Sequence, residues 1–204
     1  MKKINIETTQ KNHFIGCWNI NDDQLMDEII SFFENNTNDH EIGVSGYGDI
    51  NKEKKDSVDI SIKPKDLKLQ KYKIFLNYFE HLNNCYWDYI NQWDFLKNKW
   101  NDLYVGPFNI QKYEKNGHFK KWHTERDSIS SAHRVLAWMT YLNDLESGHT
   151  DFKHFDISIK PEKGKTLIWP AEWTHAHRGG LVKKEKYVIT GWFHFPSQSN
   201  NNNN

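Results

Sequence analysis

His123 and Glu125, two positions apart, and His175 and His177, further along the chain, are the residues whose types and spacing best suit chemistry. Side chains alternate along an extended strand, so the members of each pair share a face if their segments are strands. A histidine and a carboxylate joined by one distant histidine make a metal site with three protein ligands and open positions. Non-haem Fe(II) sites have this ligand set.

Other interpretations of these histidines stay open. Seven of the eleven histidines lie between His118 and His177, and a histidine two residues from a carboxylate occurs by chance in many chains. The cluster could be structural, or it could hold another divalent metal in a non-catalytic jelly-roll binding module. It could also form a zinc hydrolase site with three protein ligands and a water.

A lysine on the predicted strand 186–192 bears on this choice. Alternation places Lys186, Val188, Thr190 and Trp192 on one side of that strand. A lysine on a β-branched face is costly to bury without a partner, unless it lies at an edge and extends its ammonium to solvent. The functional alternative is that the ammonium of Lys186 meets the carboxylate of a bound dicarboxylate, which a zinc hydrolase would not explain.

These residues lie in a half of the chain that is rich in short β-prone runs. After Pro107, strands are predicted over residues 108–113, 119–125, 134–143, 155–160, 166–169, 175–179 and 186–195, with turn signals at Asn116-Gly117, Gly148 and Lys163-Gly164. Strands this short and dense predict a mainly β fold, either a sandwich or a jelly roll.

The first half of the chain predicts helices that support this β core. Asp22 and Asp23 precede apolar residues at helical spacing, which predicts a helix near 23–35. Residues 67–95 predict one or two helices across the outside of a sheet, and 57–62 alternates as a strand. We expect one domain over 1–196, with helical support over about 1–100, a β core over about 101–196 and a disordered Asn-rich tail over 197–204.

Composition limits the class of protein. Lys+Arg and Asp+Glu both total 27, so no electrostatic footprint for nucleic acid stands out, and the lysine runs 52–55 and 183–186 are expected on solvated faces. Cys17 and Cys85 predict reduced thiols rather than a disulfide. Without a signal-peptide pattern or a long apolar stretch, we expect a soluble, cytoplasmic protein with no membrane partner.

Together, residues of the second half form an ordered set of motifs: Tyr113, Gly117, His123, Glu125, Arg134, Tyr141-Leu142-Asn143, Gly148, Thr150, Phe152, Pro161, Gly164, Pro170, His177, Lys186-Tyr187 and Trp192. This set resembles the 2-oxoglutarate/Fe(II)-dependent dioxygenases over about residues 109–195. Within them it is most similar to the prolyl 4-hydroxylase branch, including its microbial and phage-encoded members, so the cytoplasm would be that of the host if a phage encodes the chain. The resemblance implies a double-stranded β-helix, a form of jelly roll.

The resemblance also implies roles for the site residues. The iron ligands are His123, Glu125 and His177; His177 is favoured over His175 because the family's basic residue follows the distal histidine by nine or ten positions, as Lys186 does. Lys186 pairs with the C5 carboxylate of 2-oxoglutarate. Tyr113, Tyr141 and Thr190 are expected to contact this cosubstrate, and Trp192 and Arg126 to lie on the substrate side, with loops 43–56 and 126–132 gripping the substrate.

The implied reaction hydroxylates a C–H bond, most simply of a peptidyl proline, and converts 2-oxoglutarate to succinate. It uses Fe(II), 2-oxoglutarate and O2, with ascorbate as a further cofactor. Another protein side chain, a free amino acid or a nucleobase are alternative substrates. One departure from the pattern is Glu125, where prolyl hydroxylases usually have aspartate.

Overall fold

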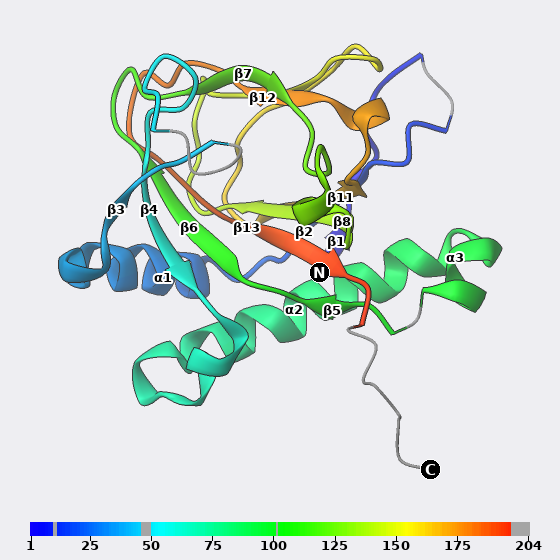
Figure 1. Cartoon of the computed structure of the whole chain (residues 1–204), viewed down its shortest axis with the longest axis horizontal. Helices are drawn as coiled ribbons and strands as arrows, with labels where there is room; N and C mark the ends of the chain where they lie inside the picture. The colour runs from blue at the N-terminus through cyan, green and yellow to red at the C-terminus, as the bar shows by residue number, and fades with distance from the viewer. Residues whose placement is uncertain (10–11, 46–49, 101, 197–204) are drawn as a thin grey trace.

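Two antiparallel sheets face each other in the computed structural model, which describes residues 1–9, 12–45, 50–100 and 102–196 (Figure 1). The major sheet has the order β1-β2-β11-β8-β13-β6-β4-β3, with β5 also paired to β13. Its strands are β1 Lys2–Lys3, β2 Gly16–Asn19, β3 Glu41–Ile42, β4 Val58–Ile62, β5 Tyr104–Val105, β6 Phe108–Tyr113, β8 Arg134–Tyr141, β11 Lys165–Pro170 and β13 Lys186–His194.

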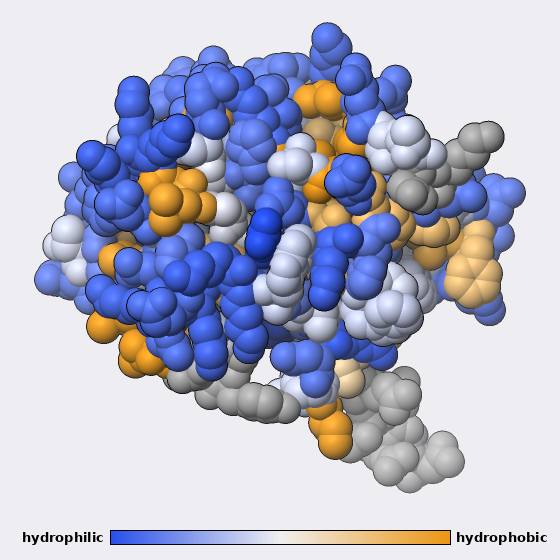
Figure 2. All heavy atoms as spheres, turned by 90° about the horizontal axis from the view of Figure 1, so that it is seen from above, coloured by the Kyte–Doolittle hydropathy of each residue, from blue (hydrophilic) through white to orange (hydrophobic). Residues whose placement is uncertain are grey.

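The minor sheet has the order β10-β9-β12-β7. Its strands are β7 Phe119–His123, β9 Thr150–Phe152, β10 Ile157–Ile159 and β12 His177–Gly179. Seen from the side of β7 and β12, the molecular surface is mostly hydrophilic, with apolar side chains limited to separate patches (Figure 2). The two sheets give the jelly-roll core that the sequence predicts.

The central strand β13 separates two apolar cores because its side chains alternate. Tyr187, Ile189 and Phe193 belong to the larger cluster, between the major sheet and the helices. Val188 and Trp192, on the opposite face, belong to or pack against the cluster between the two sheets. The face that carries Lys186 therefore points into the interior of the jelly roll.

Helices cover the outer face of the major sheet (Figure 1). They are α1 Asp23–Asn35, α2 Ile74–Asn91 and α3 Asp94–Lys99, with 3-10 turns η1 Thr37–Asp39, η2 Pro64–Lys68, η3 Gln70–Tyr72, η4 Ile129–Ser131 and η5 Trp173–His175. The carboxylate of Asp22 accepts a hydrogen bond from the Leu25 amide at 3.0 Å, an N-cap that contributes about 1 kcal/mol. The predicted helix at 23–35 is confirmed.

Three expectations from the sequence need correction. The first half of the chain is more than a helical support, because β1, β2 and β3 join the major sheet beside β4, the strand predicted at 57–62. The predicted strand at 175–179 begins only at His177, since residues 173–175 form η5. The short strand β9 was not predicted, because three residues are too few to show alternation.

The charged runs also differ from expectation. Lys55, assigned to a solvated face, is buried and forms an ion pair with Asp59. Cys17 and Cys85 are both free thiols, as predicted, and both are buried. Among the described residues, no helix has the length and apolar character needed to span a membrane. The predicted tail at 197–204 and the Gly46-Tyr47-Gly48 part of the predicted substrate loop lie outside the described residues.

Candidate active site

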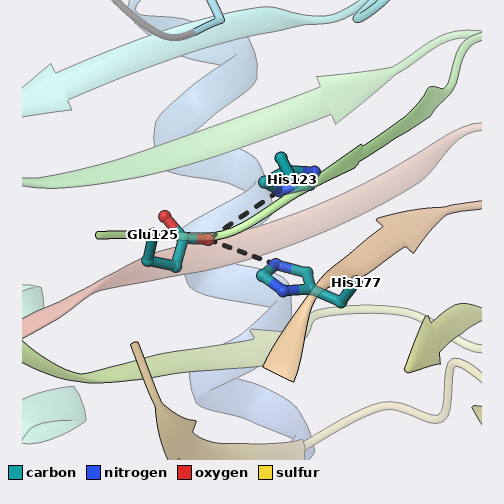
Figure 3. Close-up of side chains that lie close together, drawn as sticks. All are labelled: His123, Glu125 and His177. Atoms are coloured by element: carbon teal, nitrogen blue, oxygen red, sulfur yellow. Dashed lines mark ion pairs between the residues drawn. The ribbon is translucent and has the colours of Figure 1, made fainter. Parts of the chain in front are cut away.

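Three side chains from two neighbouring strands of the minor sheet converge at one point (Figure 3). His123 is the last residue of β7 and pairs in register with His177, the first residue of β12. Glu125 follows β7 by two residues, and its Oε1 lies 3.2 Å from Nε2 of His177 and 3.8 Å from Nε2 of His123. The candidate ligand atoms all lie within 4.8 Å of one another. The structure thus brings together His123, Glu125 and His177.

Both imidazole rings are held with Nε2 toward this centre. Nδ1 of His123 lies 2.9 Å from the Lys121 carbonyl oxygen, and Nδ1 of His177 lies 2.9 Å from the His175 carbonyl oxygen. Because a carbonyl can only accept, each Nδ1 carries the proton and donates it. The lone pairs of both Nε2 atoms are left for a metal ion. The ring of Phe119 stacks on His123 with centroids 3.8 Å apart.

The carboxylate of Glu125 is also held in place. Its Oε2 accepts a hydrogen bond from the indole N–H of Trp192 at 2.8 Å. Arg134 donates to the Glu125 backbone carbonyl at 3.0 Å, and its guanidinium lies 3.6 Å over the Trp192 ring. Oε1 is the oxygen left facing the two histidines. Arg134 is in the sequence motif, but its side chain was given no role there.

The protonation states of these groups suit metal binding. Burial, followed by the neighbouring His177, lowers the pKa of His123 to about 3. Burial alone would raise the pKa of Glu125, but its polar neighbours, His177 first and then His123 and the Trp192 indole, lower it to about 2. At neutral pH the site therefore presents a neutral imidazole at His123 and an ionised carboxylate at Glu125, the forms in which both groups bind metal.

His175 is not part of this cluster. It lies on η5, where its Nε2 is 2.9 Å from the His13 carbonyl oxygen and its Nδ1 is 2.9 Å from the Thr174 hydroxyl. Both ring nitrogens are thus engaged away from Glu125. The preference for His177 over His175 agrees with this geometry.

The cluster opens into a cavity of about 350 Å³ between the two sheets. Four alternate residues of β13, Lys186, Val188, Thr190 and Trp192, all line it, as the strand pattern predicts. Tyr113 lines it from β6. The cavity therefore connects the three candidate metal ligands with the basic residue nine positions after His177.

Lys186 lies in this cavity as a buried cation. Lys186 is only 3% exposed. Its Nζ donates to the Gly148 carbonyl at 2.9 Å and lies 4.7 Å from the centroid of the Tyr113 ring. Within the described part of the chain no carboxylate forms an ion pair with it, and burial lowers its pKa to about 8. A buried ammonium without an acid partner is costly, so the arrangement fits an anionic ligand that completes it.

Two of the residues expected to contact the cosubstrate or substrate do not line the cavity. Tyr141 lies behind the cavity wall, where its hydroxyl donates to Thr150 at 2.6 Å, and it is Thr150 that lines the cavity. Arg126 forms an ion pair with Glu172 and does not line the cavity. Arg134, at the start of β8, is the arginine that reaches the site.

A chain of polar side chains in the cavity wall was missed in the sequence. The Tyr113 hydroxyl donates to Gln111 at 2.8 Å, and the Gln111 amide donates to Asp59 at 3.2 Å. Asp59 also accepts from Lys55 at 2.6 Å and from Ser57 at 2.7 Å. Asp59 and Gln111 are in register on β4 and β6. The alternation within each strand was visible in the sequence, but their pairing was not.

Comparisons with known proteins agree with this geometry. The sequence model of the 2OG-Fe(II) oxygenase superfamily matches residues 108–194 of the chain. No curated protein sequence matches the chain. In fold it is similar to a Pseudomonas putida prolyl-4-hydroxylase, with a TM-score of 0.66 and 15% identity over 91% of this chain and 94% of the other.

Two further solved structures are similar in fold. The viral collagen prolyl hydroxylase of Paramecium Bursaria Chlorella virus-1, in its 2OG complex, gives a TM-score of 0.64 at 14% identity, covering 91% of this chain and 98% of the other. A Trichoplax adhaerens prolyl hydroxylase, in complex with a hypoxia inducible factor peptide fragment, gives a TM-score of 0.69 at 11% identity, covering 90% of this chain and 84% of the other.

The residues present fit the group that this superfamily uses. Two imidazole nitrogens and one carboxylate oxygen converge without filling a full coordination sphere, and the cavity beside them holds a buried ammonium with no acid partner. Residues 108–194 include all four of these side chains. Residues 108–194 therefore match a 2OG-Fe(II) oxygenase domain, and the chain is a dioxygenase that depends on Fe(II), 2-oxoglutarate and O2.

Proposed function

We propose that this dioxygenase hydroxylates a peptidyl proline, with 2-oxoglutarate decarboxylated to succinate. The observation that carries the proposal is a single cavity in which His123, Glu125 and His177 converge and Lys186 is buried without a carboxylate partner. The choice of a proline substrate is supported by similarity in fold to prolyl hydroxylases, of which the Trichoplax structure holds a peptide fragment.

In this proposal each residue has a defined role. His123, Glu125 and His177 would hold Fe(II), which when bound activates O2 for the hydroxylation. Lys186 binds the C5 carboxylate of 2-oxoglutarate, with the Tyr113 ring against its ammonium. Because burial strengthens the attraction between an ammonium and a carboxylate, Lys186 selects a dicarboxylate over a 2-oxo acid with one carboxylate.

Other parts of the cavity lining suit a peptide. They carry side chains that can hydrogen-bond with peptide N–H and C=O groups, namely Ser61, Asn109, Thr190 and the serines of the 126–132 loop, Ser128, Ser130 and Ser131. Trp192, with the Arg134 guanidinium stacked over its ring, forms an aromatic wall beside Glu125 and next to the reaction centre. A proline ring would pack on such a wall while its backbone is held by the polar groups.

The test is a hydroxylation screen of proline-containing peptides with Fe(II) and 2-oxoglutarate, read by mass spectrometry together with succinate. The expected result is one added oxygen atom on proline and an equal amount of succinate. His123→Ala should abolish both products. The matched control is His133→Ala, which replaces an exposed histidine that does not line the cavity and should leave turnover unchanged.

Free proline, peptides without proline and nucleosides belong in the same screen. Oxygen transfer to one of these, with none to peptidyl proline, would overturn the substrate assignment and keep the dioxygenase. No succinate with any substrate, from protein that binds Fe(II) and 2-oxoglutarate, would favour a non-catalytic binding module.

A further inference from the structure

The Lys186 side chain lines the cavity. Of its three N–H groups, one donates to the Gly148 carbonyl oxygen at 2.9 Å. The Tyr113 ring is a second neighbour, with its centroid 4.7 Å from Nζ. Gly179 is a third, where an added Cβ atom would be 3.7 Å from Nζ of Lys186. Gly179 lines the cavity, whereas Gly148 does not.

Of the two glycines next to Lys186, one is required by the backbone and the packing, and the other is not. Gly148 has a φ of +72°, and a Cβ there would lie 2.4 Å from Cγ1 of Val182, so backbone and packing both require glycine. At Gly179 the backbone is not in the left-handed region. Its nearest contacts to an added Cβ, with Phe119 and Lys186, are 3.6 and 3.7 Å, which is ordinary van der Waals contact. The fold itself would accept alanine at Gly179.

A glycine inside a strand weakens it, because it packs no side chain and costs conformational entropy. Gly179 belongs to β12 and pairs with Phe119 on one side and Thr150 on the other. Gly179 ends β12, where the register with β7 shifts, and a glycine in a strand marks either such an irregularity or the close approach of a ligand. A ligand can approach Gly179 closely, because Gly179 lines the same cavity as Lys186.

We propose that Gly179 determines cosubstrate specificity: its missing side chain leaves the space that the distal carboxylate of a five-carbon 2-oxo diacid occupies against Lys186. This inference rests on the proposed binding of 2-oxoglutarate at Lys186. A methyl group at position 179 would compete with that carboxylate for the space beside the ammonium, without touching the three candidate metal ligands.

The experiment measures binding by calorimetry in protein loaded with Mn(II), which replaces Fe(II) without turnover. Gly179→Ala should weaken 2-oxoglutarate binding by about tenfold, or about 1.4 kcal/mol, and Gly179→Val should weaken it further. The matched control is Gly180→Ala: a Cβ there also meets only ordinary contacts, 3.6 Å from the His149 backbone, and Gly180 does not line the cavity. Its affinity for 2-oxoglutarate should equal that of the wild type.

Pyruvate serves as a second probe, because this short 2-oxo acid has no distal carboxylate to reach Lys186. Its affinity should be the same in the wild type and in Gly179→Ala. Unchanged melting temperature and Mn(II) affinity in Gly179→Ala would show that the loss of 2-oxoglutarate binding is local.

The possible results separate this inference from the proposed function. If Lys186→Met weakens 2-oxoglutarate binding and Gly179→Ala does not, the role of Gly179 is wrong and that of Lys186 stands. Equal weakening of pyruvate and 2-oxoglutarate by Gly179→Ala would also contradict it, because the effect would then lie at the metal. If wild-type protein with Mn(II) does not bind 2-oxoglutarate, the proposed function fails and the inference fails with it.

Discussion

Trp192 donates its indole N–H to Oε2 of Glu125 across 2.8 Å, although the two residues are 67 positions apart. This contact fixes one oxygen of the carboxylate and turns the other, Oε1, toward His177 at 3.2 Å and His123 at 3.8 Å. Glutamate is one methylene longer than the aspartate that prolyl hydroxylases usually have. Trp192 therefore restrains the additional side-chain torsion that this longer residue brings to the site.

Trp192→Phe should weaken metal binding. Phenylalanine keeps an aromatic ring beneath Arg134 but removes the N–H, so Glu125 loses its restraint. Loss of a hydrogen bond to a metal-binding carboxylate lowers metal affinity by about 10- to 100-fold. Titration of metal-free protein with Mn(II) measures the effect. Equal affinity in wild-type and Trp192→Phe protein would contradict the restraining role.

Replacing His177 with alanine should remove the bound metal, whereas replacing the neighbouring His175 should not. His177→Ala removes a nitrogen that lies 3.2 Å from Oε1 of Glu125, so we expect loss of stoichiometric metal binding. His175→Ala removes a buried imidazole that bonds the His13 carbonyl, so we expect lower stability but one metal ion per chain. Metal analysis of the purified, folded proteins distinguishes them. Metal loss in His175→Ala with retention in His177→Ala would reverse the assignment.

The predictability of this site from the sequence depended on where each residue sits in its strand. The alternation of β13 correctly placed Lys186, Val188, Thr190 and Trp192 on one face, because a strand in the centre of a sheet has a regular pleat. His175 and His177 could not be separated in this way. The strand starts only at His177, and η5 breaks the alternation just before it.

Residues whose burial depends on pairing across the sheet were the ones missed. Lys55 lies in a charged run that has the composition of a solvated surface, yet it is 3% exposed because Asp59 accepts from it inside the cavity wall. That position exists only once β4 has paired with β6. Arg126 was expected on the substrate side, whereas the fold brings Arg134 to the site, where it donates to the Glu125 backbone carbonyl.

The affinity for 2-oxoglutarate should fall as pH rises above about 8. Burial lowers the pKa of the Lys186 ammonium to about 8, below its ordinary value. The carboxylate of 2-oxoglutarate binds the protonated form, so binding is strongest below this pKa and weakens by about tenfold per pH unit above it. In unliganded protein the same pKa shift affects the stability of the fold, which should rise with pH. The desolvated ammonium destabilises the fold most below about pH 8, and this cost falls as the ammonium deprotonates.

Calorimetric titration of the Mn(II)-loaded protein between about pH 7 and about pH 9.5 tests this, with net proton uptake expected near pH 8. The control is Lys186→Arg, because a guanidinium stays charged over the whole range. Its affinity for 2-oxoglutarate should vary less with pH than that of the wild type. The same pH dependence in both proteins would assign the titration to another group.

Removing only one partner of the buried Lys55–Asp59 pair should destabilise the fold strongly. The side chains of Lys55 and Asp59 are 3% and 10% exposed, and their charged atoms lie 2.6 Å apart. Lys55→Met leaves the Asp59 carboxylate buried without its cation, which costs about 3–5 kcal/mol of unfolding free energy. Urea unfolding of the metal-free protein measures this loss.

The double variant Lys55→Met/Asp59→Leu should recover most of that stability, because two apolar side chains of similar volume replace the pair without leaving a charge behind. It should not recover the order of the cavity wall, since Gln111 then loses the acceptor for its amide and Tyr113 loses the fixed orientation of Gln111. A double variant as unstable as Lys55→Met would show that packing around Lys55, rather than its charge, holds this wall in place.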